Sequence, residues 1–171
     1  SRRSAGRVAS IADAWPRLSG PTLDFHAAAT GIGRDWQARP PAKLWAVELT
    51  DNGHACASCA DGRVFIVDHA GSNDVVRALA LADGRELWRT PYLEPSRHYY
   101  DYARATPTVD GGRVYTLSQA GLVHGLDAAT GRVLWRVDTV ADYGGVRPRH
   151  NYSAPVGVWG NLAYLQPGGT N

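Results

Sequence analysis

The chain has 171 residues, with 18 Lys and Arg against 16 Asp and Glu, which gives a formal net charge of +2. This balance excludes a dedicated nucleic-acid binder, in which basic residues would dominate. No apolar run approaches the roughly 18 residues that a membrane-spanning helix needs, so no membrane span is predicted.

Residues 1–40 are predicted to be an N-terminal tail and lead-in segment. Arg2, Arg3 and Arg7 make its start basic, which is typical of a solvated tail or of the remnant beside a removed signal sequence. The stretch WPRLSGP follows at residues 15–21.

A repeated pattern occupies residues 41–171. Trp45, Trp88 and Trp135 lie 43 and 47 residues apart. A second marker recurs in phase with them, as DGRV at 61–64 and GGRV at 111–114. Repeats of about 40–50 residues are typical of β-propellers, in which each blade has four strands.

Each period contains four short hydrophobic stretches separated by turn signals. β-branched and aromatic residues fill RVFIV and RVYTL, and Asp-Gly, Gly-Gly and Thr-Gly pairs favour tight turns. The predicted strands are about 54–60, 63–68, 75–81 and 85–90 in the first period and about 104–109, 113–118, 122–126 and 132–138 in the second. We therefore predict an all-β fold, a β-propeller of four-stranded antiparallel blades. Two blades (54–90 and 104–138), a truncated third (152–171) and one outer strand near Trp45 are expected.

The stretches GLDAATGRVLW (125–135) and LALADGRELW (79–88) resemble the tryptophan-docking motif of the PQQ-like, or quinoprotein-type, propeller repeat. The resemblance implies that each motif Trp packs between neighbouring blades. WPRLSGP also resembles the opening of secreted bacterial members of this family, although Leu18 and Ser19 depart from that pattern. The structural docking residues implied in this way are Trp45, Trp88, Trp135, Gly84, Gly131 and Asp127.

A closed propeller needs about four to eight blades, and the sequence holds about two and a half. At about 45 residues a blade, the ring requires roughly 300–400 residues. We expect an N-terminal fragment of a longer chain, with the missing blades supplied by the rest of that chain or by another subunit. Because most members of the family are exported bacterial proteins, the resemblance implies an extracytoplasmic location, periplasmic or secreted.

Cys56 and Cys59 form a Cys-x-x-Cys pair that suits neither redox chemistry nor zinc. A thioredoxin-type pair lies at a helix N-terminus, whereas this one lies in a predicted strand. A zinc site needs two further ligands at matching spacing, and no second pair follows. Residues three apart on a strand point to opposite faces, which disfavours a disulfide between them. No catalytic residue and no metal ligand is predicted.

One group of residues is a candidate binding surface. Aligning the repeats places His54, Arg104 and Tyr152 at equivalent positions, at one mouth of the central channel. Two insertions beside them, 97–104 and 142–152, are rich in Tyr, His and Arg, which are common in recognition surfaces. A protein partner or a small anionic or polar ligand fits this composition; solvated loops that cover the blade edge are the alternative. The candidate surface comprises His54, Tyr99, Tyr100, Arg104, Arg149, His150 and Tyr152.

Three functions are compatible with these features. The first is a non-catalytic exported propeller that acts as a binding or scaffold module. The second is a fragment of a PQQ-dependent alcohol or sugar dehydrogenase, which would bring PQQ and calcium as cofactors. The adjacent-cysteine element that this enzyme class uses to hold the quinone is absent from the sequence, and no cofactor site is evident. The third is a sensor domain of a larger protein such as a kinase.

Overall fold

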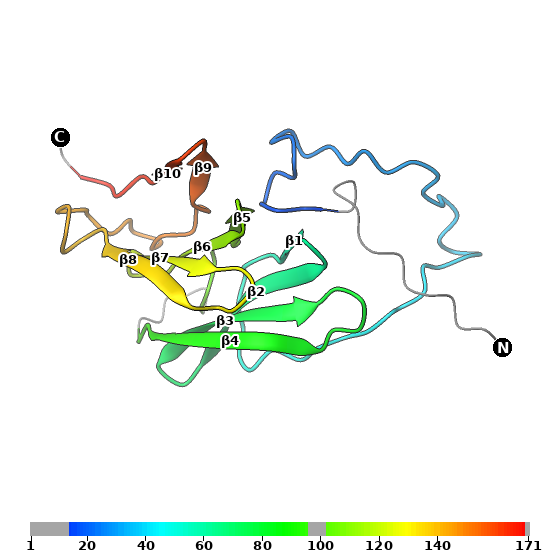
Figure 1. The fold of residues 1–171 in the computed structure, drawn as a ribbon, viewed down its shortest axis with the longest axis horizontal. Coiled ribbons are helices and arrows are strands. Elements are labelled where there is room, and N and C mark those ends of the chain that lie inside the picture. The colour runs from blue at the N-terminus through cyan, green and yellow to red at the C-terminus, as the bar shows by residue number, and fades with distance from the viewer. Residues whose placement is uncertain (1–13, 96–101, 170–171) are drawn as a thin grey trace.

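Two antiparallel four-stranded sheets and a hairpin make up the folded part of the computed structural model, which describes residues 14–95 and 102–169 (Figure 1). The first sheet has the order β1-β2-β3-β4 and the second β5-β6-β7-β8, and β9 pairs with β10. The strands are β1 (Ser58–Ala60), β2 (Arg63–Ala70), β3 (Asn73–Ala80), β4 (Glu86–Leu93), β5 (Thr108–Asp110), β6 (Arg113–Leu117), β7 (Leu122–Asp127), β8 (Val133–Asp138), β9 (Gly157–Trp159) and β10 (Leu162–Tyr164). The described residues contain no helix. The predicted all-β fold of four-stranded antiparallel units is confirmed, and the ring is not closed.

Each sheet is a meander because tight turns join neighbouring strands. Asp61 and Gly62 both have positive φ, 49° and 71°, in the two-residue turn between β1 and β2. Gly111 and Gly112 occupy the equivalent turn between β5 and β6, with φ of 53° and 72°. Such angles match the right-handed twist of the paired strands. The turn signals in the sequence therefore lie where the hairpins form.

A β-bulge recurs at the same place in both sheets. In the first sheet, Ala78 pairs with Trp88 but Leu79 pairs with Glu86. The second sheet repeats the shift, where Gly125 pairs with Trp135 and Leu126 with Val133. The extra residue in each outer strand re-aims the tryptophan that follows it. The two sheets are thus copies of one unit down to this irregularity.

Apolar side chains are buried between successive units, as expected when each sheet covers its neighbour. One cluster joins the first two sheets and is made of Ala60, Phe65, Val76, Ala78, Val109, Val114, Leu126 and Ala128. A second cluster joins the second sheet to the β9–β10 unit and is made of Ala105, Tyr115, Leu117, Val123, Tyr152, Val156 and Val158. Figure 1 shows the sheets layered in chain order, β1–β4, β5–β8, then β9 and β10.

The outer strand predicted near Trp45 is not formed. Residues 41–49 are assigned to no strand, although Trp45 and Val47 alternate with more exposed neighbours. The segment crosses the first sheet instead, where Arg77 Nη1 donates to Glu48 O at 3.1 Å. A strand needs a hydrogen-bonded neighbour, and the described residues place none along this segment. In these residues, no helix is long and apolar enough to cross a membrane.

Candidate functional site

Trp45 and Trp88 lie against glycines of the following unit. The Trp88 indole Nε1 donates to Ala128 O at 3.1 Å, and a Cβ at Gly131 would lie 2.5 Å from its ring. In the same way, Trp45 Nε1 donates to Leu81 O at 2.9 Å, and a Cβ at Gly84 would lie 2.7 Å from its ring. Only glycine permits these approaches. Each indole therefore reaches from one unit to the outer hairpin of the next.

Trp135 has a different environment from the other two tryptophans. Its ring covers Gly125 on the neighbouring strand, where a Cβ would lie 2.4 Å away. The Tyr115 ring is tilted against it, with centroids 6.0 Å apart. Trp135 also packs against the cluster between the second sheet and the β9–β10 unit.

Asp127 organises the outer hairpin of the second sheet. Its Oδ1 accepts hydrogen bonds from Thr130 N at 2.9 Å, Thr130 Oγ1 at 2.8 Å and Ala129 N at 3.1 Å. These bonds, led by the Thr130 hydroxyl, hold the pKa of Asp127 below its ordinary value. Its role is to shape the turn that carries Gly131.

The structure brings two of the predicted mouth residues, Arg104 and His150, into direct contact. Arg104 Nη1 donates to His150 O at 2.5 Å, which joins the two insertions. His54 is exposed, and its backbone N–H donates to Ala103 O at 2.8 Å. Arg149 is exposed beside His150. Tyr99 and Tyr100 lie outside the described residues. We call His54, Arg104, Arg149 and His150 the mouth surface.

Tyr152 differs from the prediction because it is 5% exposed. Its ring belongs to the apolar cluster between the second sheet and the β9–β10 unit, and its hydroxyl donates to Pro167 O. Its backbone N–H donates to Gln119 O at 3.2 Å. The buried ring of Tyr152 therefore anchors the end of the second insertion to this apolar cluster.

A cavity of about 470 Å³ opens beside the mouth surface. Its walls combine apolar side chains with the backbone of the second insertion. The lining residues are Leu117, Pro148, Arg149, His150, Asn151, Tyr152, Ser153, Ala154, Pro155, Tyr164, Leu165 and Gln166. The lining thus combines apolar side chains with one arginine and one histidine, which can donate hydrogen bonds to an anionic group.

A group of buried polar side chains at the same end of the sheets was not predicted. His69 Nδ1 lies 2.9 Å from Asp74 Oδ1, and His69 Nε2 donates to Gly71 O at 2.8 Å. The Tyr92 hydroxyl donates to Asp74 Oδ2 at 3.1 Å. We call His69, Asp74, Tyr92, Glu94, Tyr102 and His124 the interblade polar cluster.

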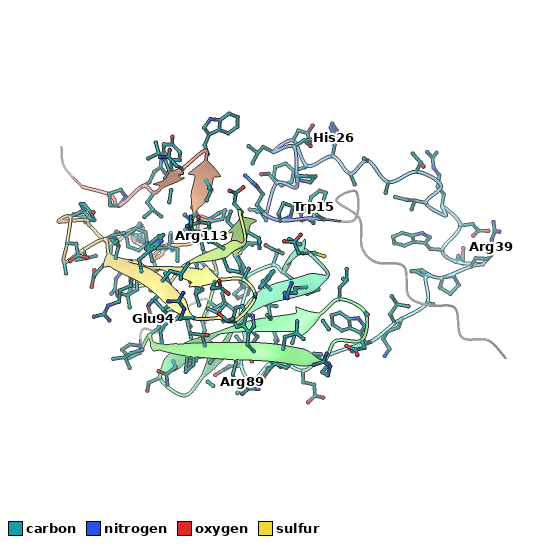
Figure 2. All side chains as sticks on the ribbon, in the orientation of Figure 1. Trp15, His26, Arg39, Arg89, Glu94 and Arg113 are labelled. Atoms are coloured by element: carbon teal, nitrogen blue, oxygen red, sulfur yellow. The ribbon has the colours of Figure 1, made fainter. Side chains whose placement is uncertain are left out.

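The interblade polar cluster joins the first two units. The Tyr92 ring stacks on His124 of the second sheet, with centroids 4.2 Å apart. Tyr102 stacks on His69 at 3.6 Å. Glu94, which Figure 2 labels just beyond the end of β4, accepts from Ala120 N at 3.0 Å. The sequence did not predict that these polar residues would be in contact, because they are separated by up to 55 residues along the chain.

Burial sets the electrostatics of this cluster. It raises the pKa of Asp74 to about 6 against the opposing hydrogen bond from His69, and the charge of Glu94 adds to the rise. Burial also lowers the pKa of His124 to about 4, and the charge of Arg136 adds to that fall. The pKa of Tyr92 is raised well above its ordinary value, first by burial and then by the charge of Asp74.

Neither cysteine forms a disulfide; Cys56 is exposed and Cys59 is half-buried. Across residues 14–95 and 102–169, no three His, Cys, Asp or Glu side chains are grouped so that they could hold a metal ion. The carboxylates of Asp74 and Glu94 in the interblade polar cluster accept hydrogen bonds from protein groups.

Comparison with known proteins places this geometry in a family. Residues 35–170 match the sequence family described as outer membrane protein assembly factor BamB. This match confirms the resemblance to PQQ-like repeats. No curated protein sequence matches the chain.

Three solved structures illustrate the structural likeness. BamB from Moraxella catarrhalis is 26% identical with a TM-score of 0.49, over 58% of this chain and 29% of that one. Quinohemoprotein alcohol dehydrogenase from Comamonas testosteroni is 20% identical with a TM-score of 0.52, over 70% of this chain and 18% of that one. Quinohemoprotein alcohol dehydrogenase ADHIIG from Pseudomonas putida HK5 is 25% identical with a TM-score of 0.51, over 70% and 18%. The chain thus spans less than a third of the length of each of these structures.

Proposed function

The chain belongs to the outer membrane protein assembly factor BamB family, and on that premise we propose that it forms part of a non-catalytic, extracytoplasmic propeller that binds a protein partner. The family match over residues 35–170 is the observation that carries the proposal. The partner site is the mouth surface with the adjoining cavity. The process it serves is the assembly of outer-membrane proteins.

The chemistry of the mouth surface supports a protein partner. Arg149 and His150 are exposed next to a cavity of about 470 Å³, and Arg104 joins their loop to the preceding unit. Arginine and aromatic residues anchor protein interfaces, because they combine apolar contact area with directional hydrogen bonds. Two loops from different blades share this surface, so its shape depends on the packing of the blades.

A PQQ-dependent dehydrogenase is the second candidate, favoured by the likeness to ADHIIG. The described residues do not fit its cofactors. Cys56 and Cys59 are not adjacent, and the carboxylates of Asp74 and Glu94 are buried and hydrogen-bonded to protein groups. The proposal therefore includes no quinone and no calcium. Titration of the chain with PQQ and Ca²⁺, followed by calorimetry, tests this: saturable binding would favour the dehydrogenase.

In vivo cross-linking tests the protein partner directly. A photo-reactive amino acid at position 150 is expected to cross-link to a protein of the outer-membrane assembly machinery, identified by mass spectrometry. Position 132, an exposed arginine on the outer hairpin, is the matched control and is expected to give no such product. The same product at both positions, or none at position 150, would contradict the proposal. The cross-linked cells also report location, because fractionation is expected to place the chain outside the cytoplasm.

A further inference from the structure

Residues 15–17 lie between the inner strands of the first two blades. Trp15 pairs with Cys59 of β1 through two backbone hydrogen bonds of 2.8 Å, one in each direction. Pro16 O accepts from Val109 N of β5 at 2.7 Å. The segment is thus hydrogen-bonded to β1 on one side and to β5 on the other.

Arg17 extends these contacts to the third blade. Its Nη2 lies 3.2 Å from Asp110 Oδ1 at the end of β5, and its Nη1 donates to Val158 O of β9 at 3.5 Å. The Arg17 side chain is 16% exposed. Three consecutive residues therefore bind the inner strands of all three blades.

The inner strands offer free edges at this place. β1, β5 and β9 are each the first strand of their sheet, and within the described residues each has one strand neighbour. An unpaired edge presents backbone N–H and C=O groups to any extended chain. Residues 15–17 satisfy part of the hydrogen bonding of these strands.

The local sequence preorganises the segment for this position. Gly20 N donates to Arg17 O at 2.9 Å, and Gly20 has a φ of 78°. A Cβ at Gly20 would lie 2.9 Å from the Trp15 ring, so the ring folds back over the turn. Pro16 has no N–H to leave unpaired, and its ring fixes φ at about −65°. Figure 2 labels Trp15 on the lead-in segment, above the hairpin that begins with β1.

We propose that the facing edges of β1, β5 and β9 form a binding groove for an extended peptide of the pattern aromatic–Pro–Arg, and that residues 15–17 occupy it in cis as an axial plug. The plug lies outside the family match, which begins at residue 35, and the proposed function does not enter this inference. It lies beside the β1–β2 and β5–β6 turns, since its partners Cys59 and Val109 come shortly before them.

Amide hydrogen exchange on the full chain tests whether the plug protects the inner strands. In Arg17→Ala, the amides of Cys59 and Val109 are expected to exchange about tenfold faster than in the wild type, because the charged contacts that hold the plug are lost. The amides of Val67 and Val76 are expected to keep their rates. Arg39→Ala, which removes an exposed arginine of the same lead-in segment, is the matched control. Unchanged rates at Cys59 and Val109 would overturn the proposal.

A peptide added in trans tests the groove itself. Millimolar AWPRLSGP, the sequence of residues 14–21, is expected to restore slow exchange at Cys59 and Val109 in Arg17→Ala. The wild type, whose groove is filled, is expected to show no change. A scrambled peptide of the same composition is the control. If neither peptide slows exchange, or both do so equally, the groove is not a peptide site.

Discussion

Asp74 and His124 lie on either side of Tyr92, and burial shifts the pKa of the two groups in opposite directions. The pKa of Asp74 is raised to about 6. Between the pKa of Asp74 in the unfolded chain and pH 6, the folded chain therefore binds more protons at this site, and stability falls as the pH rises. The pKa of His124 is lowered to about 4. Between pH 4 and the pKa of His124 in the unfolded chain, the unfolded chain therefore binds more protons, and stability rises with pH. Each contribution is on the order of 3 kcal/mol. Because the windows overlap, the two contributions offset each other.

Replacing either Asp74 or His124 is expected to reveal the effect of the other group on the pH dependence of stability. In Asp74→Asn only the titration of His124 remains, so the free energy of unfolding of this variant should increase between pH 4 and pH 6.5. In His124→Gln only the titration of Asp74 remains, so the free energy of unfolding of this variant should decrease over the same range. Urea denaturation at several pH values measures both slopes. Two variants with the same pH profile would show that these groups do not control it.

The Tyr152 hydroxyl provides a second test at this scale. It donates to Pro167 O inside the cluster between the second sheet and the β9–β10 unit. Tyr152→Phe is expected to destabilise the chain by about 1 kcal/mol, since one buried hydrogen bond is lost while the ring packing remains. Tyr143→Phe is the control because Tyr143 is 71% exposed, and its melting temperature should equal that of the wild type. Equal melting temperatures for the two variants would argue against the anchoring role of Tyr152.

Among the elements, β4 carries the tryptophan that reaches the next blade. Trp88→Ala removes a half-buried indole and its hydrogen bond to Ala128 O, so a loss of about 3 kcal/mol is expected. Trp159→Ala on β9, where the indole is 72% exposed, should cost less than about 1 kcal/mol. Chemical denaturation of both variants makes the comparison. If Trp88→Ala lowers the free energy of unfolding as little as Trp159→Ala does, Trp88 does not stabilise the packing between blades.

The strands were predictable because their signals are local. The prediction of 113–118 compares with β6 at Arg113–Leu117, and the prediction of 63–68 with the longer β2, Arg63–Ala70. Turn glycines and alternating β-branched residues act within a few positions of each other. The outer strand near Trp45 was wrong for the opposite reason, since a strand exists only where a neighbour pairs with it.

The candidate site was less predictable because it depends on contacts between blades. Repeat alignment placed Tyr152 next to His54 and Arg104, but its side chain is buried because the β9–β10 unit covers it. The bulge before Trp88 and the meeting of Tyr92 with His124 depend on how sheets pack. No periodicity in the sequence reports such contacts between distant strands.

For the whole molecule, the β9–β10 unit presents apolar side chains to solvent. Trp159, Leu162 and Tyr164 are 72%, 54% and 51% exposed. Apolar patches on a strand edge favour association. We expect the 171-residue chain to self-associate with increasing concentration in sedimentation velocity, and Trp159→Lys to reduce this. Ile32→Lys, at an exposed position in the lead-in segment, should not. Equal association of both variants would place the contact elsewhere.

The measurement that tests the proposed function most directly is complementation of a deletion of the gene. Cells without the gene are expected to contain less outer-membrane protein, and the wild-type gene should restore the amount. A gene carrying Arg149→Glu, which reverses a charge at the mouth surface, should fail to restore it, whereas Arg132→Glu on the outer hairpin should succeed. Quantitative proteomics of the outer membrane gives the readout. Two results would contradict the proposal that the mouth surface binds a protein partner in outer-membrane protein assembly. One is an unchanged amount of outer-membrane protein after deletion, and the other is equal restoration by both variants.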